Sequence, residues 1–192
     1  LAGTFTELGE ELRAANPELS IAFSFAGSST LVRQVNEGAP ADVLATANLA
    51  TMKQASERAP ETVIYAGNEL VIVTPPGNPA GVAGLESFAD LDLTTAVCAA
   101  EVPCGSAAEQ VFAAAGITPK VSTYTENVTA ALTLAASGEV DAALVYATDA
   151  AAAKGEVESI VFPDSEAAVT EDPIAVLSDA RNPRAAQAFV DL

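Results

Sequence analysis

The segment Leu70-Val-Ile-Val-Thr74 is an uninterrupted run of aliphatic and β-branched residues, and the loop Pro75-Pro-Gly-Asn-Pro79 follows it at once. A short run of this kind, bounded by Pro and Gly, is typical of a β-strand. Its lack of apolar–polar alternation indicates that both faces of the strand are buried. A sheet with two buried faces needs helices on both sides, so the segment predicts an α/β fold.

Helical and strand patterns alternate on either side of this segment. We expect strands over residues 21–25, 41–45, 70–74, 94–98, 121–124, 142–146, 160–162 and 174–177. We expect helices over residues 5–15, 31–37, 49–58, 85–91, 106–115, 128–137 and 183–190. Strands separated by helices of this length are typical of parallel βαβ units.

The chain of 192 residues is long enough for one large domain or for two small lobes, each with its own core. It contains no internal repeat, no low-complexity segment and no linker that cleanly divides it. Two lobes, if present, should therefore be joined by extended crossings. The best candidates for these crossings lie around Asn68-Glu69 and Tyr146-Ala-Thr148.

Acidic residues outnumber basic residues by 26 to 8, which gives a net charge of −18. This excess argues against nucleic-acid binding, which needs clustered Lys and Arg, and against docking on an anionic membrane. Solubility is the simplest explanation of the charge. No apolar run reaches the roughly 20 residues that span a bilayer. No signal peptide is recognisable at Leu1, although a targeting segment can be removed during maturation.

The sequence has no histidine, which removes Ser-His-Asp and Cys-His activation and the commonest metal ligand. An enzyme is therefore the least expected function. The only cysteines, Cys98 and Cys104, are too far apart in sequence for a CxxC redox motif, and without histidine they make a poor zinc site. We favour a structural disulfide that closes a short loop in an oxidising, extracytoplasmic compartment. Two free buried thiols are the alternative.

Four segments combine capping residues with the start of an expected helix. They are Thr4-Phe-Thr-Glu7, Gly27-Ser-Ser-Thr30, Ser106-Ala-Ala-Glu109 and Thr125-Glu-Asn-Val128. Each start exposes backbone N–H groups and the positive end of a helix dipole. If several such ends converge where strands end, they can bind an anion without any Lys or Arg. None of the eight basic residues lies in these segments.

A structural explanation of these helix starts competes with the functional one. Ser and Thr begin many helices simply because their side chains cap them. The Gly27-Ser-Ser-Thr30 loop is more specific, because glycine permits close approach of the backbone to a ligand, but it is not a P-loop. A site of neutral donors suits a fully deprotonated tetrahedral dianion, whereas phosphate carries a proton and needs an acceptor. Tyr146, at the end of a buried strand, either donates to a ligand or fills the core.

Several segments, taken together, resemble the molybdate-binding proteins of bacterial ABC transporters. They are Gly27-Ser-Ser-Thr-Leu-Val-Arg-Gln34, Glu37-Gly-Ala-Pro-Ala-Asp-Val43, Val102-Pro-Cys-Gly105, Glu126-Asn-Val128 and Val145-Tyr-Ala-Thr-Asp-Ala150. They follow the family's order and span nearly the whole chain. The resemblance implies an α/β type II periplasmic-binding fold with two lobes of mixed, mostly parallel sheet flanked by helices. Lobe I would comprise residues 1–68 and 148–192, and lobe II residues 69–147.

The resemblance also implies five contacts to an oxyanion, through Thr4, Ser28, Cys104, Val128 and Tyr146. Thr4 stands where the family usually has Ser, and Cys104 replaces the usual Ala at a position used through its N–H. Val128 would act through its N–H and Tyr146 through its hydroxyl. No residue would bind a metal ion directly, and no cofactor is expected.

The implied function is capture of molybdate or tungstate in the cleft between the lobes and delivery to the permease of an ABC transporter. We expect a monomer that does not bind nucleic acid, either periplasmic or lipid-anchored at the outer face of the membrane. One alternative is a binding protein for sulfate or another tetrahedral oxyanion. Another is an oxyanion sensor, which would need an appended DNA-binding or signalling domain. A Cys98–Cys104 disulfide is not general in the family, and it would stiffen one wall of the site.

Overall fold

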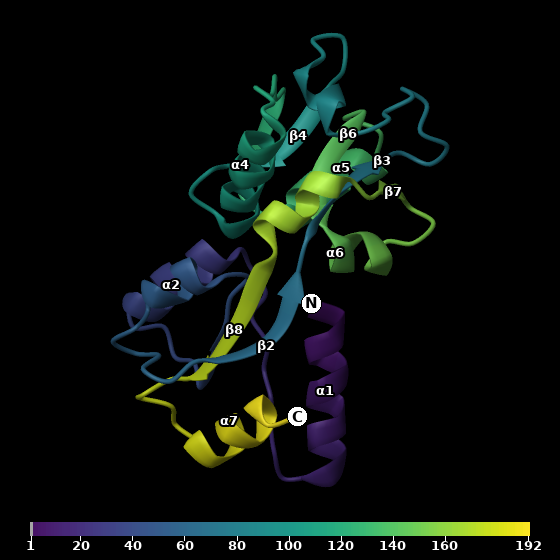
Figure 1. Ribbon diagram of the computed structural model, residues 1–192. Helices are drawn as coiled ribbons and strands as arrows, with labels where there is room; N and C mark the ends of the chain where they lie inside the picture. The colour runs from purple at the N-terminus through teal and green to yellow at the C-terminus, as the bar shows by residue number, and fades with distance from the viewer. Residues whose placement is uncertain (1) are drawn as a thin grey trace. The chain divides into compact units, whose positions relative to one another are not determined.

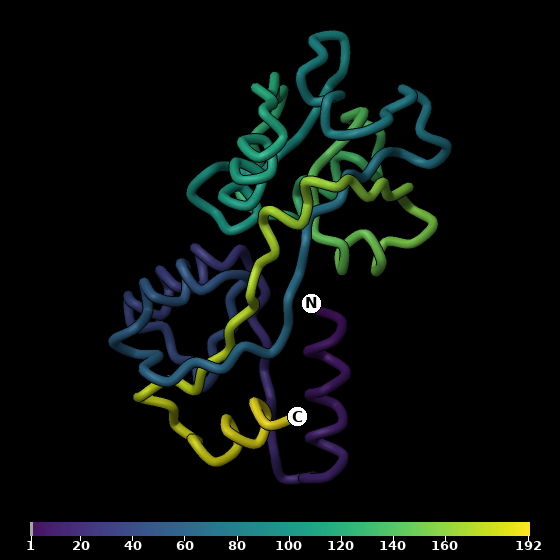
Figure 2. Tube along the Cα trace, viewed as in Figure 1, coloured from purple at the N-terminus to yellow at the C-terminus, as the bar shows by residue number. Residues whose placement is uncertain are grey.

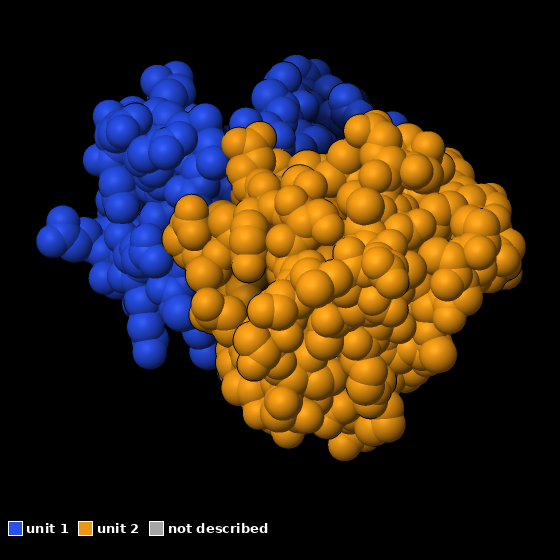
Figure 3. Space-filling model, turned by 90° about the horizontal axis from the view of Figure 1, so that it is seen from above, with its two compact units in different colours: residues 1–66, 171–192 blue, residues 67–170 orange. Residues whose placement is uncertain are grey.

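The computed structural model describes residues 2–192, and the chain folds into two compact units. Unit 1 consists of residues 1–66 and 171–192, and unit 2 of residues 67–170, as coloured in Figure 3. Both passages of the chain between the units occur within β-strands, namely β2 (Val63–Asn68) and β8 (Thr170–Val176). Extended strands rather than flexible tethers therefore connect the two units.

The second passage lies later than the sequence indicated, between residues 170 and 171 rather than around Tyr146-Ala-Thr148. The elements in between belong to unit 2: α6 (Ala147–Ala152), β7 (Glu158–Ile160) and the 3₁₀ helix η2 (Pro163–Ala168). β7 pairs with β3, and η2 packs against α4. Hydrophobic periodicity could not show this, because it does not tell which sheet a short element joins.

Unit 2 contains a five-stranded mixed sheet with the order β5-β4-β6-β3-β7. Its other strands are β3 (Leu70–Thr74), β4 (Thr95–Cys98), β5 (Thr123–Thr125) and β6 (Ala142–Tyr146). β4 runs parallel to β5 and β6, whereas β3 is antiparallel to β6 and β7, so parallel pairing is less dominant than expected. Every residue of β3 is buried, which confirms the prediction from its composition.

Helices cover both faces of this sheet (Figure 1). Val71 and Val73 pack with Ala131 and Ala135 of α5 (Val128–Ala136), and α6 extends the same layer. The alternate residues of β3 point to the opposite face, where α4 (Pro103–Ala115) lies against β4 and β6. The small 3₁₀ helix η1 (Leu85–Ala89) adds Phe88, whose ring contacts Phe112 of α4.

Unit 1 contains a three-stranded sheet with the order β1-β8-β2, in which β1 (Val43–Ala45) pairs antiparallel with β8. The helices α2 (Ser28–Asn36) and α3 (Leu49–Lys53) bury Val32, Val35 and Met52 against this sheet. The terminal helices α1 (Ala2–Ala15) and α7 (Pro183–Val190) lie side by side, as the trace in Figure 2 shows.

The predicted strand over residues 21–25 is wrong. The segment is not part of any strand, and it borders an apolar groove of about 600 Å³ that residues of β1, α2 and α7 also line. Phe23 and Phe25 stack on each other at 5.5 Å and stay partly exposed. The sequence pattern suits a strand, but a strand also needs a neighbour for its backbone hydrogen bonds, and no segment in residues 2–192 provides one.

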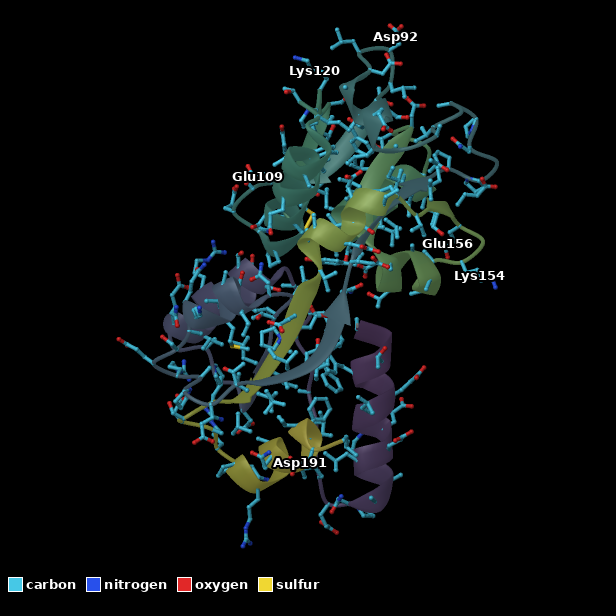
Figure 4. The ribbon with its side chains drawn as sticks, viewed as in Figure 1. Asp92, Glu109, Lys120, Lys154, Glu156 and Asp191 are labelled. Carbon is cyan, nitrogen blue, oxygen red and sulfur yellow. A yellow bond between two sulfur atoms is a disulfide. The ribbon has the colours of Figure 1, made fainter. Side chains whose placement is uncertain are left out.

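Most charged side chains lie at the surface of each unit, and Asp172 of unit 1 is a buried exception. Figure 4 labels exposed examples, including Asp92, Glu109 and Glu156 of unit 2 and Asp191 of unit 1. Within the described part of the chain, no helix is both long enough and apolar enough to cross a membrane.

Candidate functional site

Three adjacent parallel strands of unit 2 end at the same edge of its sheet. β4 ends at Cys98 and β5 at Thr125, and these two residues are direct partners in the register. Thr95 lies opposite Ala142, so the same register places Ala99 beside Tyr146 at the end of β6. Ligands of open α/β sheets bind beyond the carboxyl ends of parallel strands. These strand ends therefore define the candidate site of unit 2.

The helix after β5 begins at Val128, in agreement with the predicted helix start at Thr125-Glu-Asn-Val128. The Asn127 side chain caps it by accepting a hydrogen bond of 2.9 Å from the Ala130 N–H. The Thr125 hydroxyl donates to the Asn127 carbonyl at 3.0 Å, which holds the cap in place. Val128 is the first helical residue, so its N–H has no carbonyl partner inside the helix. The positive end of the helix dipole lies at this N–H.

The helix after β4 begins at Pro103, so the predicted start at Ser106 is wrong by three residues. Proline suits the first helical position because its fixed φ is already helical and it lacks an N–H that would need a partner. Ser106 lies inside the helix and does not cap it. Cys104 occupies the second position, where the backbone N–H again has no carbonyl partner inside the helix.

Cys98 and Cys104 form a disulfide, which confirms the structural bridge expected from their spacing (Figure 4). Their Cα atoms are 5.7 Å apart, and both residues are buried. The bond joins the last residue of β4 to the first turn of α4. The disulfide therefore attaches the start of α4, where the Cys104 N–H lies, to the end of β4.

Tyr146 is the last residue of β6, lies opposite Leu70 of β3, and is buried. It also forms the N-cap position of α6, whose first turn carries Asp149. Burial raises the pKa of the Asp149 carboxyl, and a hydrogen bond that it accepts from the Tyr146 backbone partly offsets this effect. Sequence reasoning missed Asp149, although its position three residues after a strand end is typical of a helix-capping acid.

In unit 1 the helix α2 begins at Ser28 with Gly27 as its N-cap, as the Gly27-Ser-Ser-Thr30 segment predicted. The Ser28 hydroxyl oxygen accepts a hydrogen bond of 3.1 Å from the Ala47 N–H. Because the hydroxyl is the acceptor in this bond, its own proton can be directed toward another partner. Ser28 also carries a backbone N–H in the first turn of the helix, where the helix supplies no acceptor for it.

Ala47 precedes a second capped helix start, whose helix the sequence predicted from Leu49 but whose cap it did not identify. The Thr46 hydroxyl donates to the Asn48 carbonyl at 2.9 Å, and the Asn48 side chain accepts from the Thr51 N–H at 2.8 Å. The signal that could have found this cap is the spacing Thr-x-Asn at the end of a short strand, which it shares with Thr125-Glu-Asn127.

Thr4 does not begin a helix, because α1 already includes Ala2. Alanine has the highest helix propensity, so it extends the helix past the expected capping box. Thr4 is exposed on α1, which packs against α7, and Figure 1 draws α1 well away from α2. The structure aligns Cys104, Val128 and Tyr146 along one edge of unit 2, whereas Thr4 and Ser28 lie on two different helices of unit 1.

The donors of this candidate site are neutral. Backbone N–H groups at two helix starts and a phenol favour an anion, since each presents a partial positive charge. Residues 2–192 contain no group of three His, Cys, Asp or Glu side chains that could hold a metal ion. The arrangement is therefore suited to hydrogen-bonding an oxyanion.

The comparison with known proteins agrees with this chemistry. Residues 1–192 match the family described as bacterial extracellular solute-binding protein. The chain is 38% identical over 196 residues to the "Molybdate-binding protein ModA" of Mycobacterium tuberculosis, which covers 99% of this chain and 74% of the relative.

Two solved structures share the fold. The periplasmic molybdate-binding protein of Azotobacter vinelandii matches with a TM-score of 0.84 and 20% identity, over 99% of this chain and 87% of that one. The sulfate-binding protein SubI of Mycobacterium tuberculosis matches with a TM-score of 0.78 and 16% identity, over 95% of this chain and 74% of that one. These likenesses confirm the expected α/β periplasmic-binding fold. The chain belongs to the bacterial extracellular solute-binding proteins.

Proposed function

We propose that this protein captures molybdate or tungstate outside the cytoplasm and delivers it to the permease of an ABC transporter. As a member of a solute-binding family, it is a binding protein and not an enzyme. The observation that carries the proposal is the neutral donor edge of unit 2, in a chain 38% identical to a relative named for molybdate binding.

In the proposed binding mode, unit 2 supplies the N–H groups of Cys104 and Val128 and the hydroxyl of Tyr146. Unit 1 supplies the hydroxyl and N–H of Ser28. Thr4, exposed on α1 of unit 1, stays in the proposal as a further contact through its hydroxyl and N–H. In a chain of net charge −18, helix dipoles and hydroxyl groups would hold the dianion in place of countercharges.

Donor chemistry also bears on selectivity. Molybdate, tungstate and sulfate are fully deprotonated at neutral pH and accept hydrogen bonds only. Phosphate retains a proton under these conditions and needs an acceptor in the site. The donor edge of unit 2 therefore favours the first three anions over phosphate. Sulfate stays the main competitor, because the sulfate-binding protein SubI has the same fold.

Isothermal titration calorimetry with molybdate, tungstate, sulfate and phosphate tests the proposal. We expect molybdate and tungstate to bind most tightly. Preference for sulfate would replace the proposal by its competitor, and phosphate binding as tight as that of molybdate would overturn it.

Tyr146→Phe tests the proposed phenol donor. Loss of one hydrogen bond to a charged ligand should weaken molybdate binding by roughly tenfold or more. Tyr124→Phe is the matched control, because Tyr124 lies in the same unit on β5 with an exposed side chain. Equal affinities of the two variants would remove Tyr146 from the proposed site.

The family places the protein outside the cytoplasm. We further propose that it acts as a monomer, either free in the periplasm or held by a lipid anchor at the outer face of the membrane. The oxyanion is cargo, and no resident cofactor is proposed. Cell fractionation with and without detergent separates the two locations, and light scattering gives the oligomeric state.

A further inference from the structure

The disulfide of unit 2 belongs to a chain of contacts that joins two helix starts. It links Cys98 at the end of β4 to Cys104 in the first turn of α4. Next to it, the Ala99 N–H donates to the Thr125 carbonyl at 2.8 Å, and the Val102 N–H donates to the Ala99 carbonyl at 3.1 Å. The loop closed by the disulfide is therefore hydrogen-bonded both to itself and to the end of β5.

Gly105 brings the start of α4 even closer to the strand. A Cβ atom at this position would lie 1.9 Å from the Ala99 carbonyl oxygen and 2.7 Å from the Cys98 carbonyl oxygen. Only glycine fits such an approach of two backbones without displacing one of them. A covalent bond and a close backbone contact thus hold the same turn of α4 against the end of β4.

The contacts continue to the second helix start. Thr125 accepts from Ala99 through its carbonyl, and its hydroxyl donates to the carbonyl of Asn127, which caps α5. The Cys104 N–H and the Val128 N–H are therefore attached to opposite ends of one connected frame. We call this frame, made of Cys98, Ala99, Cys104, Gly105 and Thr125, the donor frame.

We propose that the Cys98–Cys104 disulfide determines anion selectivity by fixing the spacing between the Cys104 and Val128 N–H donors. This inference rests on the proposed function. Sulfate and molybdate have the same charge and shape but differ in size. Donors held at a fixed spacing favour one size, whereas donors that can move adapt to either anion. Because the proposed ligand is the larger anion, the spacing fixed by the disulfide would favour molybdate, and loss of the disulfide would reduce the difference between the two anions.

A purely structural disulfide makes a different prediction. It would stabilise the folded chain by restricting the unfolded one, and its removal would lower the melting temperature. The affinities of the folded protein for the two anions would then keep their ratio. The ratio of the dissociation constants for sulfate and molybdate distinguishes the two roles, because it does not depend on the fraction of folded protein.

The test compares the wild type with the double variant Cys98→Ala/Cys104→Ala by titration calorimetry, at a temperature at which both are folded. We expect molybdate affinity to fall by about tenfold and sulfate affinity to change less. The dissociation constant for sulfate divided by that for molybdate should therefore fall several-fold. Leu85→Ala is the control, because Leu85 is a buried residue of unit 2 outside the donor frame. This variant should lose stability and keep the wild-type ratio.

A double variant with the wild-type ratio and a lower melting temperature would overturn the inference and leave the proposed function standing. A wild type that binds neither anion would overturn both. If the double variant does not fold, Thr125→Val tests the other end of the donor frame. It keeps the disulfide and the side-chain shape but removes the hydroxyl bond to Asn127. The inference expects a lower ratio here too, and an unchanged ratio would contradict it.

Discussion

The helix starts of α3 in unit 1 and α5 in unit 2 are built from the same local pattern. In Thr46-Ala-Asn48 and Thr125-Glu-Asn127, the threonine hydroxyl donates to the asparagine carbonyl, at 2.9 Å and 3.0 Å. In both, the asparagine side chain accepts a hydrogen bond from a backbone N–H of the first helical turn, with donor–acceptor distances of 2.8 Å and 2.9 Å. The asparagine backbone is extended in each case.

The two starts differ in the neighbours that contact them. In unit 1 the Ala47 N–H is bonded to Ser28, so the cap of α3 supports a hydroxyl on the adjacent helix. In unit 2 the Thr125 carbonyl is bonded to Ala99, so the cap of α5 is tied to the disulfide-closed loop. The same local pattern thus supports a side-chain hydroxyl donor in unit 1 and a backbone N–H donor in unit 2. The tertiary contacts of each cap determine which donor it supports.

Gly105→Ala should have the largest effect, because it disrupts the tertiary contact that sets unit 2 apart. A Cβ atom 1.9 Å from a backbone oxygen forces α4 away from β4. We expect the free energy of unfolding to fall by about 3 kcal/mol, measured by chemical denaturation. Gly67→Ala is the control, since its Cβ would make an ordinary contact of 3.6 Å with the Thr170 carbonyl oxygen. Similar losses in both variants would show that the close approach at Gly105 is unimportant.

Ser28→Ala should have the next largest effect, and it should act on binding. It removes a proposed hydrogen bond to the anion and the acceptor of the Ala47 N–H. We expect molybdate affinity to fall about tenfold by calorimetry, with a much smaller change in stability. Ser56→Ala, an exposed serine of the same unit, should bind like the wild type. Unchanged binding by Ser28→Ala would remove Ser28 from the proposed site.

The paired variants Asn48→Ala and Asn127→Ala compare the two caps directly. Each removes one capping hydrogen bond, and each should lower the free energy of unfolding by about 1 kcal/mol. Only Asn127→Ala displaces a proposed donor of its own helix, so it should weaken molybdate binding more than Asn48→Ala. Equal losses of affinity would indicate that the two starts have the same role.

Features fixed by local chemistry could be predicted from the sequence. The strand Leu70–Thr74 follows from its composition, the disulfide from the spacing of its cysteines, and the start of α2 from the Gly27-Ser28 pair. The helix start at Thr125-Glu-Asn127 could be predicted together with its capping segment, whereas at Thr46-Ala-Asn48 only the helix from Leu49 was predicted, and it ends earlier than expected, at Lys53.

Features that depend on a distant partner could not be predicted. Residues 21–25 have the pattern of a strand but no neighbour to pair with among residues 2–192. The start of α4 depends on Pro103 and on the contact between Gly105 and Ala99, and the Ser106–Glu109 capping box gave no sign of either. The unit boundary at residue 170 depends on β7 joining β3, a pairing that its sequence does not specify.

The smallest expected effect concerns the opposite pH dependence of two carboxyl groups, one in each unit. Burial raises the pKa of Asp149 in unit 2 above its ordinary value of 3.8. Its contribution therefore favours folding at low pH and is lost as the pH rises through the raised pKa. In unit 1 a hydrogen bond from Arg58 lowers the pKa of Asp179, so its contribution is present above pH 3.8 and is lost as the pH falls.

Melting temperatures of Asp149→Asn and Asp179→Asn, measured from pH 3 to pH 7, test this contrast. Relative to the wild type, Asp149→Asn should gain stability as the pH rises through the window above 3.8, because it cannot ionise. Asp179→Asn should be the less stable protein at neutral pH and should converge with the wild type in acid, with a small difference because Asp179 is exposed. Parallel pH profiles for the two variants would mean that burial of Asp149 does not govern its ionisation.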